Sequence, residues 1–148
     1  MTRAEFRELC KSACYVLNIS DTEALAEHGN IEIDGVAVGA FFDNDGDDCI
    51  HCYVDLGGVE ESSRASTFQD MLKLNLELEA RHGEAVGFDE SSGHLIFRSQ
   101  IRLGEDCDGA KLATSLRESA AIARRIRAGE LGRAALGGPA GTRMSELA

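Results

Sequence analysis

The stretch STFQDMLKLNLELEARHGEAVGFDESSGHLIFRSQIRL, residues 66–103, carries more structural information than any other part of this chain. Ser66 and Gln69 have the spacing of a capping box, and Gly83 is a typical C-terminal stop, so we expect a helix between them. Its large apolar residues sweep an arc of roughly 200°, about twice a single buried stripe. They are Phe68, Met71, Leu72, Leu74, Leu76 and Leu78. One side can cover a sheet of its own subunit, and the other side predicts a homodimer.

The residues of this helix can be divided between the two sides. We assign Leu72 and Leu76 to the core of the subunit. Asn75 is a polar residue within the apolar arc, and it is expected to fix the register of two paired helices. The predicted dimer interface consists of Met71, Leu74, Asn75 and Leu78.

The second half of the stretch predicts a hairpin. Residues 85–89 form a short apolar strand, residues 90–93 an acidic Ser-Gly turn, and residues 94–103 a longer strand. In the longer strand apolar and polar residues alternate, which is typical of a sheet with one buried face. Ser99 falls on the buried face and needs a backbone partner, whereas Ile96 falls on the other face.

The remaining elements are predicted by the same local signals. Thr2 and Glu5 form a second capping box, which begins a helix that runs to about Leu17. Asp34-Gly35 predicts a tight turn between strands 31–33 and 36–42, and a further strand follows at 49–56. A last helix covers 109–127, and residues 22–30 fit neither pattern. Three helices with about five strands give an α+β fold.

Met71-Leu72-Lys73-Leu74-Asn75-Leu76, followed by Gly83, a strand, an acidic Ser-Gly turn and an alternating strand, resembles the class I type III secretion chaperones, the CesT-like or Tir-chaperone family. The resemblance covers roughly residues 2–129. The sequence departs from the family pattern at Met71, a position where Leu is common, and in its Gly/Ala-rich end after Leu131.

The resemblance implies an α-β-β-β-α-β-β-α order with a twisted antiparallel sheet and a homodimer through the second helix. It implies a chaperone without a cofactor, in the bacterial cytoplasm, that binds the N-terminal chaperone-binding segment of one or more effectors. This segment would be kept extended, soluble and competent for export. Delivery to the secretion ATPase is a further implied step.

Length and charge agree with a single acidic domain. The 148 residues predict one domain at 1–129 and a flexible Gly/Ala-rich tail at 130–148. The net charge is −11, with −15 in residues 1–108 and +4 in residues 109–148. An acidic body repels phosphates, so nucleic acid is an unexpected partner, and basic polypeptide is favoured. No apolar run approaches a membrane span, and an odd count of five cysteines without a signal peptide indicates the cytoplasm.

Catalytic and metal motifs are weak in this sequence. Residues 43–48 are acidic, but an EF-hand alignment would place Phe41 at the first ligand position. Cys49, His51 and Cys52 leave open a thiol or zinc protein, although strand residues three apart point to opposite faces. With no nucleophile motif, we expect no enzyme and no bound metal. A third hypothesis is an acidic adaptor of the same fold that binds a folded partner.

The predicted function therefore depends on surface apolar residues. Phe41, Tyr53 and Ile96 fall on the sheet face opposite the predicted core, and the first helix leaves apolar residues near a rim. Such patches suit an extended peptide. We predict that the effector-binding residues are Phe6, Leu9, Ala13, Phe41 and Ile96.

Overall fold

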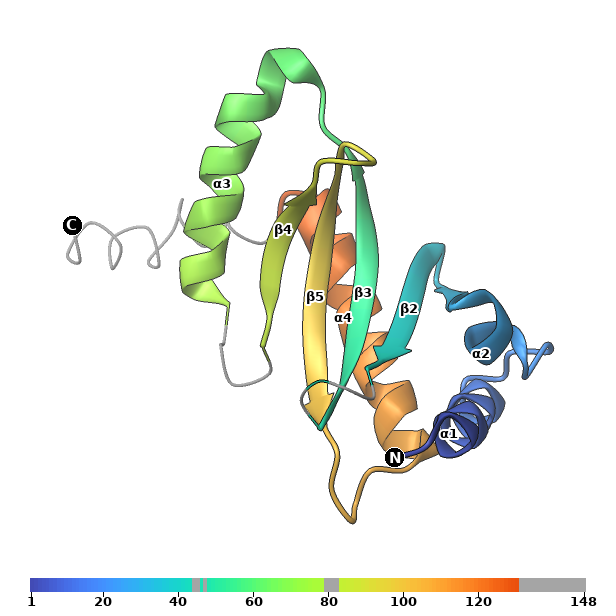
Figure 1. The fold of residues 1–148 in the computed structure, drawn as a ribbon. Coiled ribbons are helices and arrows are strands. Elements are labelled where there is room, and N and C mark those ends of the chain that lie inside the picture. The colour runs from blue at the N-terminus through green and yellow to red at the C-terminus, as the bar shows by residue number, and fades with distance from the viewer. Residues whose placement is uncertain (44–45, 47, 79–82, 131–148) are drawn as a thin grey trace.

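The computed structural model describes residues 1–43, 46, 48–78 and 83–130, and it shows a five-stranded antiparallel sheet with helices against one face and two edges (Figure 1). The strand order is β1-β2-β3-β5-β4. In chain order the elements are α1 (Arg3–Val16), α2 (Ala24–His28), β1 (Asn30–Ile33), β2 (Val36–Phe42), β3 (Cys49–Gly58), a 3-10 turn (Glu61–Ser63), α3 (Arg64–Glu77), β4 (Ala85–Asp89), β5 (His94–Arg102) and α4 (Gly109–Arg127).

The α+β class and the predicted order of the main elements are confirmed. Two short elements are additions: the 3-10 turn, and α2, which lies in the segment that the sequence left unassigned and buries Leu25. Asp34 and Gly35 both have positive φ, at 50° and 79°, and they join strands whose ends pair directly as Ile33 and Val36. This is the two-residue hairpin that Asp-Gly favours. The predicted tail lies outside the described residues from position 131 onward.

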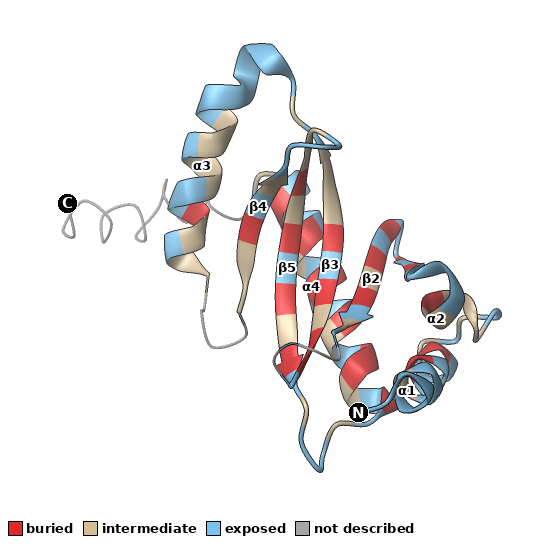
Figure 2. Ribbon diagram, viewed as in Figure 1, coloured by how far each residue is buried: buried red, intermediate tan, exposed pale blue. Residues whose placement is uncertain are grey.

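Helix α4 covers one face of the sheet and supplies much of the core. Its buried side chains pack against alternate residues of β2, β3 and β5, among them Val38, Val54 and Phe97 (Figure 2). The hydroxyl of Ser99 lies 3.0 Å from the hydroxyl of Ser119 on α4, and both are buried. Ser99 thus finds a side-chain hydroxyl where the sequence had suggested a backbone partner.

Helix α1 packs against α4 at one end of the sheet. The predicted capping box is present, with the Glu5 amide donating to Thr2 Oγ1 at 3.1 Å and the Thr2 amide donating to Glu5 Oε2 at 2.6 Å. Gly109 begins α4 where a Cβ would collide with Ser12 of α1, so the two helices approach closely. Cys10, Ala13 and Cys14 are fully buried on this side of α1.

Helix α3 lies beside β4 and closes the edge of the sheet. The Asn75 side chain accepts a hydrogen bond from the Val86 amide at 2.7 Å and donates one to the Val86 carbonyl at 3.0 Å. The backbone amide and carbonyl that the edge strand β4 presents at Val86 are therefore both satisfied by the side-chain amide of Asn75. Leu74 is only 1% exposed, and the rings of Phe68 and Phe88 lie 4.9 Å apart.

Three expectations for this helix are wrong. The helix begins at Arg64 after Ser63, so Ser66 lies inside it, and the Ser66 hydroxyl donates to the Ser63 carbonyl instead of capping. It ends at Glu77 because Leu78 is extended, and Gly83 is instead a positive-φ residue packed tightly against Gln100. Leu72 and Leu76 were assigned to the core but are 69% and 73% exposed.

Replacing Asn75 by Ala is expected to lower the free energy of unfolding by about 1–3 kcal/mol, because the Val86 amide and carbonyl lose their partner. Urea denaturation measures this change. Gln69→Ala, at an exposed position of the same helix, is the matched control and should change stability by less than about 0.5 kcal/mol. Equal losses in the two variants would contradict the role of Asn75 at the sheet edge.

Candidate functional site

The sheet face opposite α4 has no described helix across it (Figure 1). We call it the open face. Strand register places Phe41, His51 and Gln100 in one row across β2, β3 and β5, and it pairs Tyr53 with Arg98 in the next row. The side chains that define the open face are Phe41, His51, Tyr53, Ile96, Arg98, Gln100 and Arg102.

Aromatic and aliphatic groups occupy the centre of this face. Phe41 is 53% exposed and Tyr53 37%, whereas Ile96 is half-buried. The His51 ring stacks on Tyr53, with centroids 6.4 Å apart and planes at 29°. His51 Nδ1 is shielded from solvent and has no hydrogen-bond partner among the residues that the structure describes. The open face therefore presents Phe41, His51 and Tyr53 on β2 and β3 beside polar side chains on β5.

A groove lies next to Phe41, between α1, α2 and β2. It has a volume of about 520 Å³, and its lining includes Phe6, Ala26, Phe41 and Phe42. The Phe6 and Phe42 rings are 5.9 Å apart, so aromatic side chains from α1 and β2 form one wall. Because Phe41 belongs to both surfaces, the groove and the open face are continuous around the end of β2, and the groove carries charged side chains such as Arg7 and Glu27 beside its aromatic wall.

Ion pairs hold the helices on the other side of this groove. Arg7 lies 3.0 Å from both Glu23 and Glu27, and Lys11 lies 3.0 Å from Glu23. Hydrogen bonding and the charge of Glu23 raise the pKa of Arg7, and the hydrogen bond from Lys11 is the main reason that the pKa of Glu23 is lowered. These pairs tie α1 to α2 and fix the groove in shape without offering a reactive group.

The structure brings together only some of the residues predicted to bind an effector. Phe6 and Phe41 line the same groove, and Phe41 shares the open face with Ile96. Leu9 lies in a separate depression of about 540 Å³ near Leu103 and Cys107. Ala13 is fully buried within the subunit, which corrects its assignment to an exposed surface. Ala13 follows the apolar helix pattern of α1, but that pattern could not tell a buried position from the rim.

Sequence reasoning missed most of the polar and aromatic partners on these surfaces. From the sequence, His51 is a candidate metal ligand between Cys49 and Cys52. The sequence also places Arg98, Gln100 and Arg102 on the polar face of a strand, without indicating what lies beside them. Their common face follows from the β3–β5 register, which depends on long-range pairing. The period-2 alternation of β5 was the available signal.

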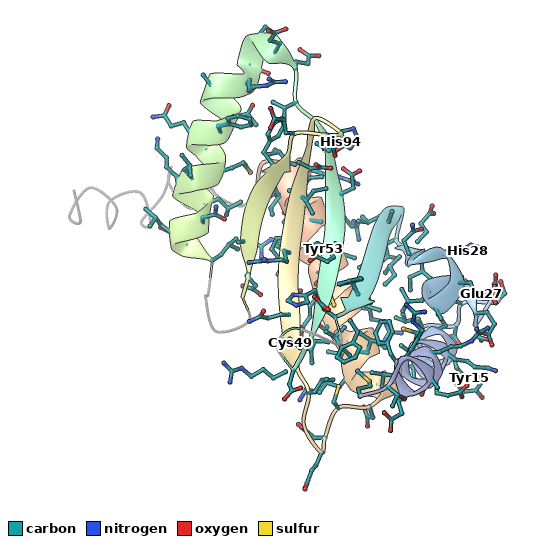
Figure 3. The ribbon with its side chains drawn as sticks, viewed as in Figure 1. Tyr15, Glu27, His28, Cys49, Tyr53 and His94 are labelled. Atoms are coloured by element: carbon teal, nitrogen blue, oxygen red, sulfur yellow. The ribbon has the colours of Figure 1, made fainter. Side chains whose placement is uncertain are left out.

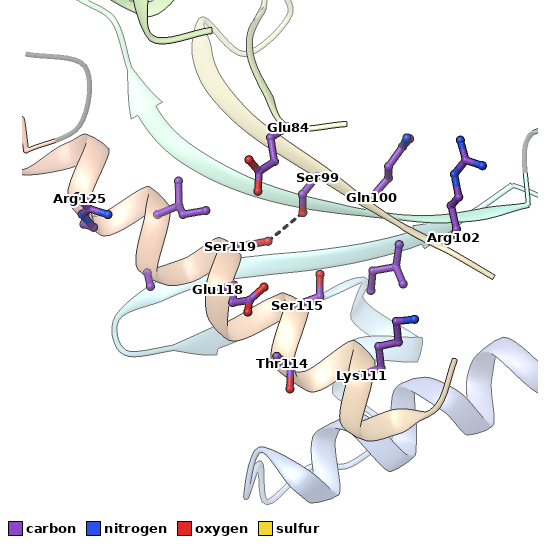
Figure 4. A pocket seen from close by; sticks show the side chains of 13 residues that line it. Glu84, Ser99, Gln100, Arg102, Lys111, Thr114, Ser115, Glu118, Ser119 and Arg125 are labelled. Carbon is purple, nitrogen blue, oxygen red and sulfur yellow. Dashed lines mark hydrogen bonds between the residues drawn. The ribbon is translucent and has the colours of Figure 1, made fainter. Parts of the chain in front are cut away.

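A second cavity, of about 700 Å³, lies between β5 and α4 (Figure 4). Ser99 and Ser119 form its floor, and its rim carries charges of both signs, including Glu118 and Arg125. Lys111 at this rim lies 2.8 Å from Asp106, and that hydrogen bond raises the pKa of Lys111. A lysine held protonated in this way is a poor nucleophile or base.

The thiol and zinc hypothesis receives no geometric support. Along β3, Cys49 and His51 fall on one side and Cys52 on the other, where Cys52 faces α4. Burial raises the pKa of Cys52 to about 11 and that of Cys10 to about 12, which leaves almost no thiolate at neutral pH. Within the described residues, no three His, Cys, Asp or Glu side chains are grouped so as to hold a metal ion.

The outward side of α3 is a further apolar surface. Leu72 and Leu76 are one turn apart and largely exposed, whereas Leu74 and Asn75 are engaged within the subunit. The helix is apolar on two sides, as its sequence predicts. However, Leu72 and Leu76 face outward instead of the core, and Leu74 and Asn75 face the subunit instead of a second copy. Across the part of the chain that the structure describes, no helix is both long and apolar enough to cross a membrane.

The sequence model of the Tir chaperone protein (CesT) family matches residues 16–127. Among solved structures, the chain is similar to a chain in the structure of the HopA1–SchA chaperone–effector complex, with 20% identity and a TM-score of 0.62. That match covers 84% of this chain and 94% of the other, and at this identity it shows the fold alone. Comparison with curated protein sequences gives no significant match.

Proposed function

Because the chain belongs to the Tir chaperone protein (CesT) family, we propose that it is a type III secretion chaperone that binds the N-terminal chaperone-binding segment of one or more effector proteins. The bound segment stays extended, soluble and competent for export in the cytoplasm. The loaded complex is then delivered to the secretion ATPase. One observation carries this proposal: the groove with its aromatic wall and the open face meet at Phe41 and form one continuous exposed surface.

The physical chemistry of this surface suits an unfolded client. Alternate side chains of an extended peptide can enter apolar pockets while its other side chains remain in water. Ordering a disordered chain costs conformational entropy, so a large contact area gives only modest net affinity. Release therefore needs no chemical step in the chaperone. The contacts we assign to the client are Phe6, Leu9, Phe41 and Ile96, with Tyr53 beside them.

We also propose that two copies of the chain pair through the outward side of α3. Leu72 and Leu76 are the two most exposed aliphatic side chains among the large hydrophobic residues of the described chain. Their contact with the same residues of a second copy would bury this surface by two-fold symmetry. Leu74 and Asn75 act in the subunit itself, so the interface shifts from the residues that the sequence suggested. Met71, within α3, and Leu78, at its C-terminal cap, are both half-buried and remain part of the proposed interface.

Co-expression with a candidate effector, followed by limited proteolysis and mass spectrometry, tests the proposed function. The protected fragment should be an N-terminal segment that is unfolded when isolated. A protected globular domain would instead support the adaptor hypothesis.

In the same assay Phe41→Asp should weaken client binding by roughly tenfold or more, because one apolar side chain loses about 1.5–3 kcal/mol of burial. Its thermal stability should stay close to wild type, since Phe41 is already half in solvent. Tyr15→Asp is the matched control, because Tyr15 is 78% exposed on the outward side of α1 (Figure 3). If both variants weakened client binding equally, the open face would not be part of the client-binding surface.

Leu72→Asp combined with Leu76→Asp should give a monomer by light scattering while leaving the fold intact, because both side chains point to solvent in the subunit. Leu74→Asp should instead unfold the subunit, since a charge would enter the core. A Leu72/Leu76 variant that keeps the mass of a dimer would show that the second copy binds elsewhere.

A further inference from the structure

Strand β5 carries two arginines on the open face. Arg98, Gln100 and Arg102 alternate along the strand, and Figure 4 shows Gln100 and Arg102 pointing away from α4 while Ser99 points toward it. Both arginines are exposed, and neither guanidinium has an ion pair or hydrogen bond with any residue that the structure describes. By contrast, Lys11 and Lys111 each lie within 3.0 Å of a carboxylate.

The carboxylates on and around the open face do not neutralise these arginines. Asp55 lies 2.8 Å from His94 at the far end of the face. Asp89 is held by the hydroxyls of Ser91 and Ser92 in the β4–β5 turn. Asp48 directly precedes the β3 residue that pairs with Arg102, and Glu84 directly precedes the β4 residue that pairs with Arg98, but among the described residues neither carboxylate forms an ion pair with these arginines. The two guanidinium groups therefore remain available to a client on a body whose first 108 residues carry a charge of −15.

The spacing of this site defines what it can bind. Same-face neighbours on a strand are about 6.7 Å apart, so a group above Gln100 is within reach of the guanidinium on either side. Strands lie about 4.8 Å apart, so Phe41 is roughly 10 Å from Gln100 along the row through His51. One extended segment can thus contact the aromatic row and the arginines at once.

Resting on the proposed function, we infer that the client segment is acidic where it crosses β5. An Asp or Glu side chain lies above Gln100 and pairs with Arg98 and Arg102, and an apolar client residue two to four positions away packs on Phe41 and His51. Charge-assisted hydrogen bonds between guanidinium and carboxylate supply the preference. The acidic net charge alone favours a basic client, so this inference is the opposite of that expectation. The reversal follows because charges beyond about 8 Å are largely screened at physiological salt, whereas these two arginines touch the client.

Three fluorescein-labelled 16-residue peptides test the inference. They share one pattern of Leu and Phe, and their intervening positions are all Glu, all Gln or all Lys. Binding to the full chain is measured by fluorescence anisotropy at 0.15 M salt. The Glu peptide should bind more tightly than the Gln peptide, by about two- to fivefold for each arginine engaged. The preference should shrink at 0.5 M salt.

The double variant Arg98→Gln/Arg102→Gln should lose this preference and still bind the Gln peptide with unchanged affinity. Lys73→Gln/Arg117→Gln removes the same net charge from α3 and α4 and should keep the preference. Tightest binding of the Lys peptide, or equal binding of the Glu and Gln peptides, would overturn the acidic-client inference and leave the proposed function standing. Failure of all three peptides to bind, while an effector complex also cannot be isolated, would overturn both.

Discussion

The packing of α4 against a single face of the sheet governs the rest of this structure. A five-stranded sheet needs at least one covered face to form a core, and α4 supplies it through a stripe that runs from Leu112 to Ile126. Helix α1 then packs on α4 rather than on the opposite face, and α3 closes the β4 edge through Asn75. With its helices placed in this way, the sheet keeps one face available, and that face carries aromatic residues and two arginines that pair with no described residue.

This arrangement suits the proposed binding of protein by a small acidic domain. The buried thiols of Cys10 and Cys52 have raised pKa values, and Lys111, beside the cavity between β5 and α4, is held by Asp106. The charges around the groove are engaged with one another through Glu23. What the surface offers instead is shape, apolar area and two guanidinium groups that are not paired within the described part of the chain. For a client without a fold of its own, these contacts can be spread along an extended chain, so that each one stays weak and the complex remains reversible.

Local patterns predicted much of the fold, and their failures have a common cause. The alternation in β5 and the Asp34-Gly35 turn depend on neighbouring residues only, and both were confirmed. At about 100° per residue, Leu74 lies roughly 200° from both Leu72 and Leu76, which share one side of the helix, so sequence alone leaves the rotation of α3 undetermined. The bond from Asn75 to Val86 settles that rotation, and it exists only once the strand is in place. The candidate site shows the same limit. The alternation of the strands assigns Phe41 and Ile96 to one face. The burial of Ala13 depends on how α1 packs, and the position of the two arginines relative to His51 and Tyr53 depends on the β3–β5 register.

Chemical-shift mapping by NMR tests this description of the binding surface most directly. The labelled chain would be titrated with the client segment recovered by proteolysis, and backbone and side-chain signals would be followed. Shifts should concentrate on Phe6, Phe41, Tyr53, Ile96 and Arg98, and the outward side of α4 should remain unchanged. Shifts confined to α4, with the open face unaffected, would contradict the view that the uncovered side of the sheet receives the client.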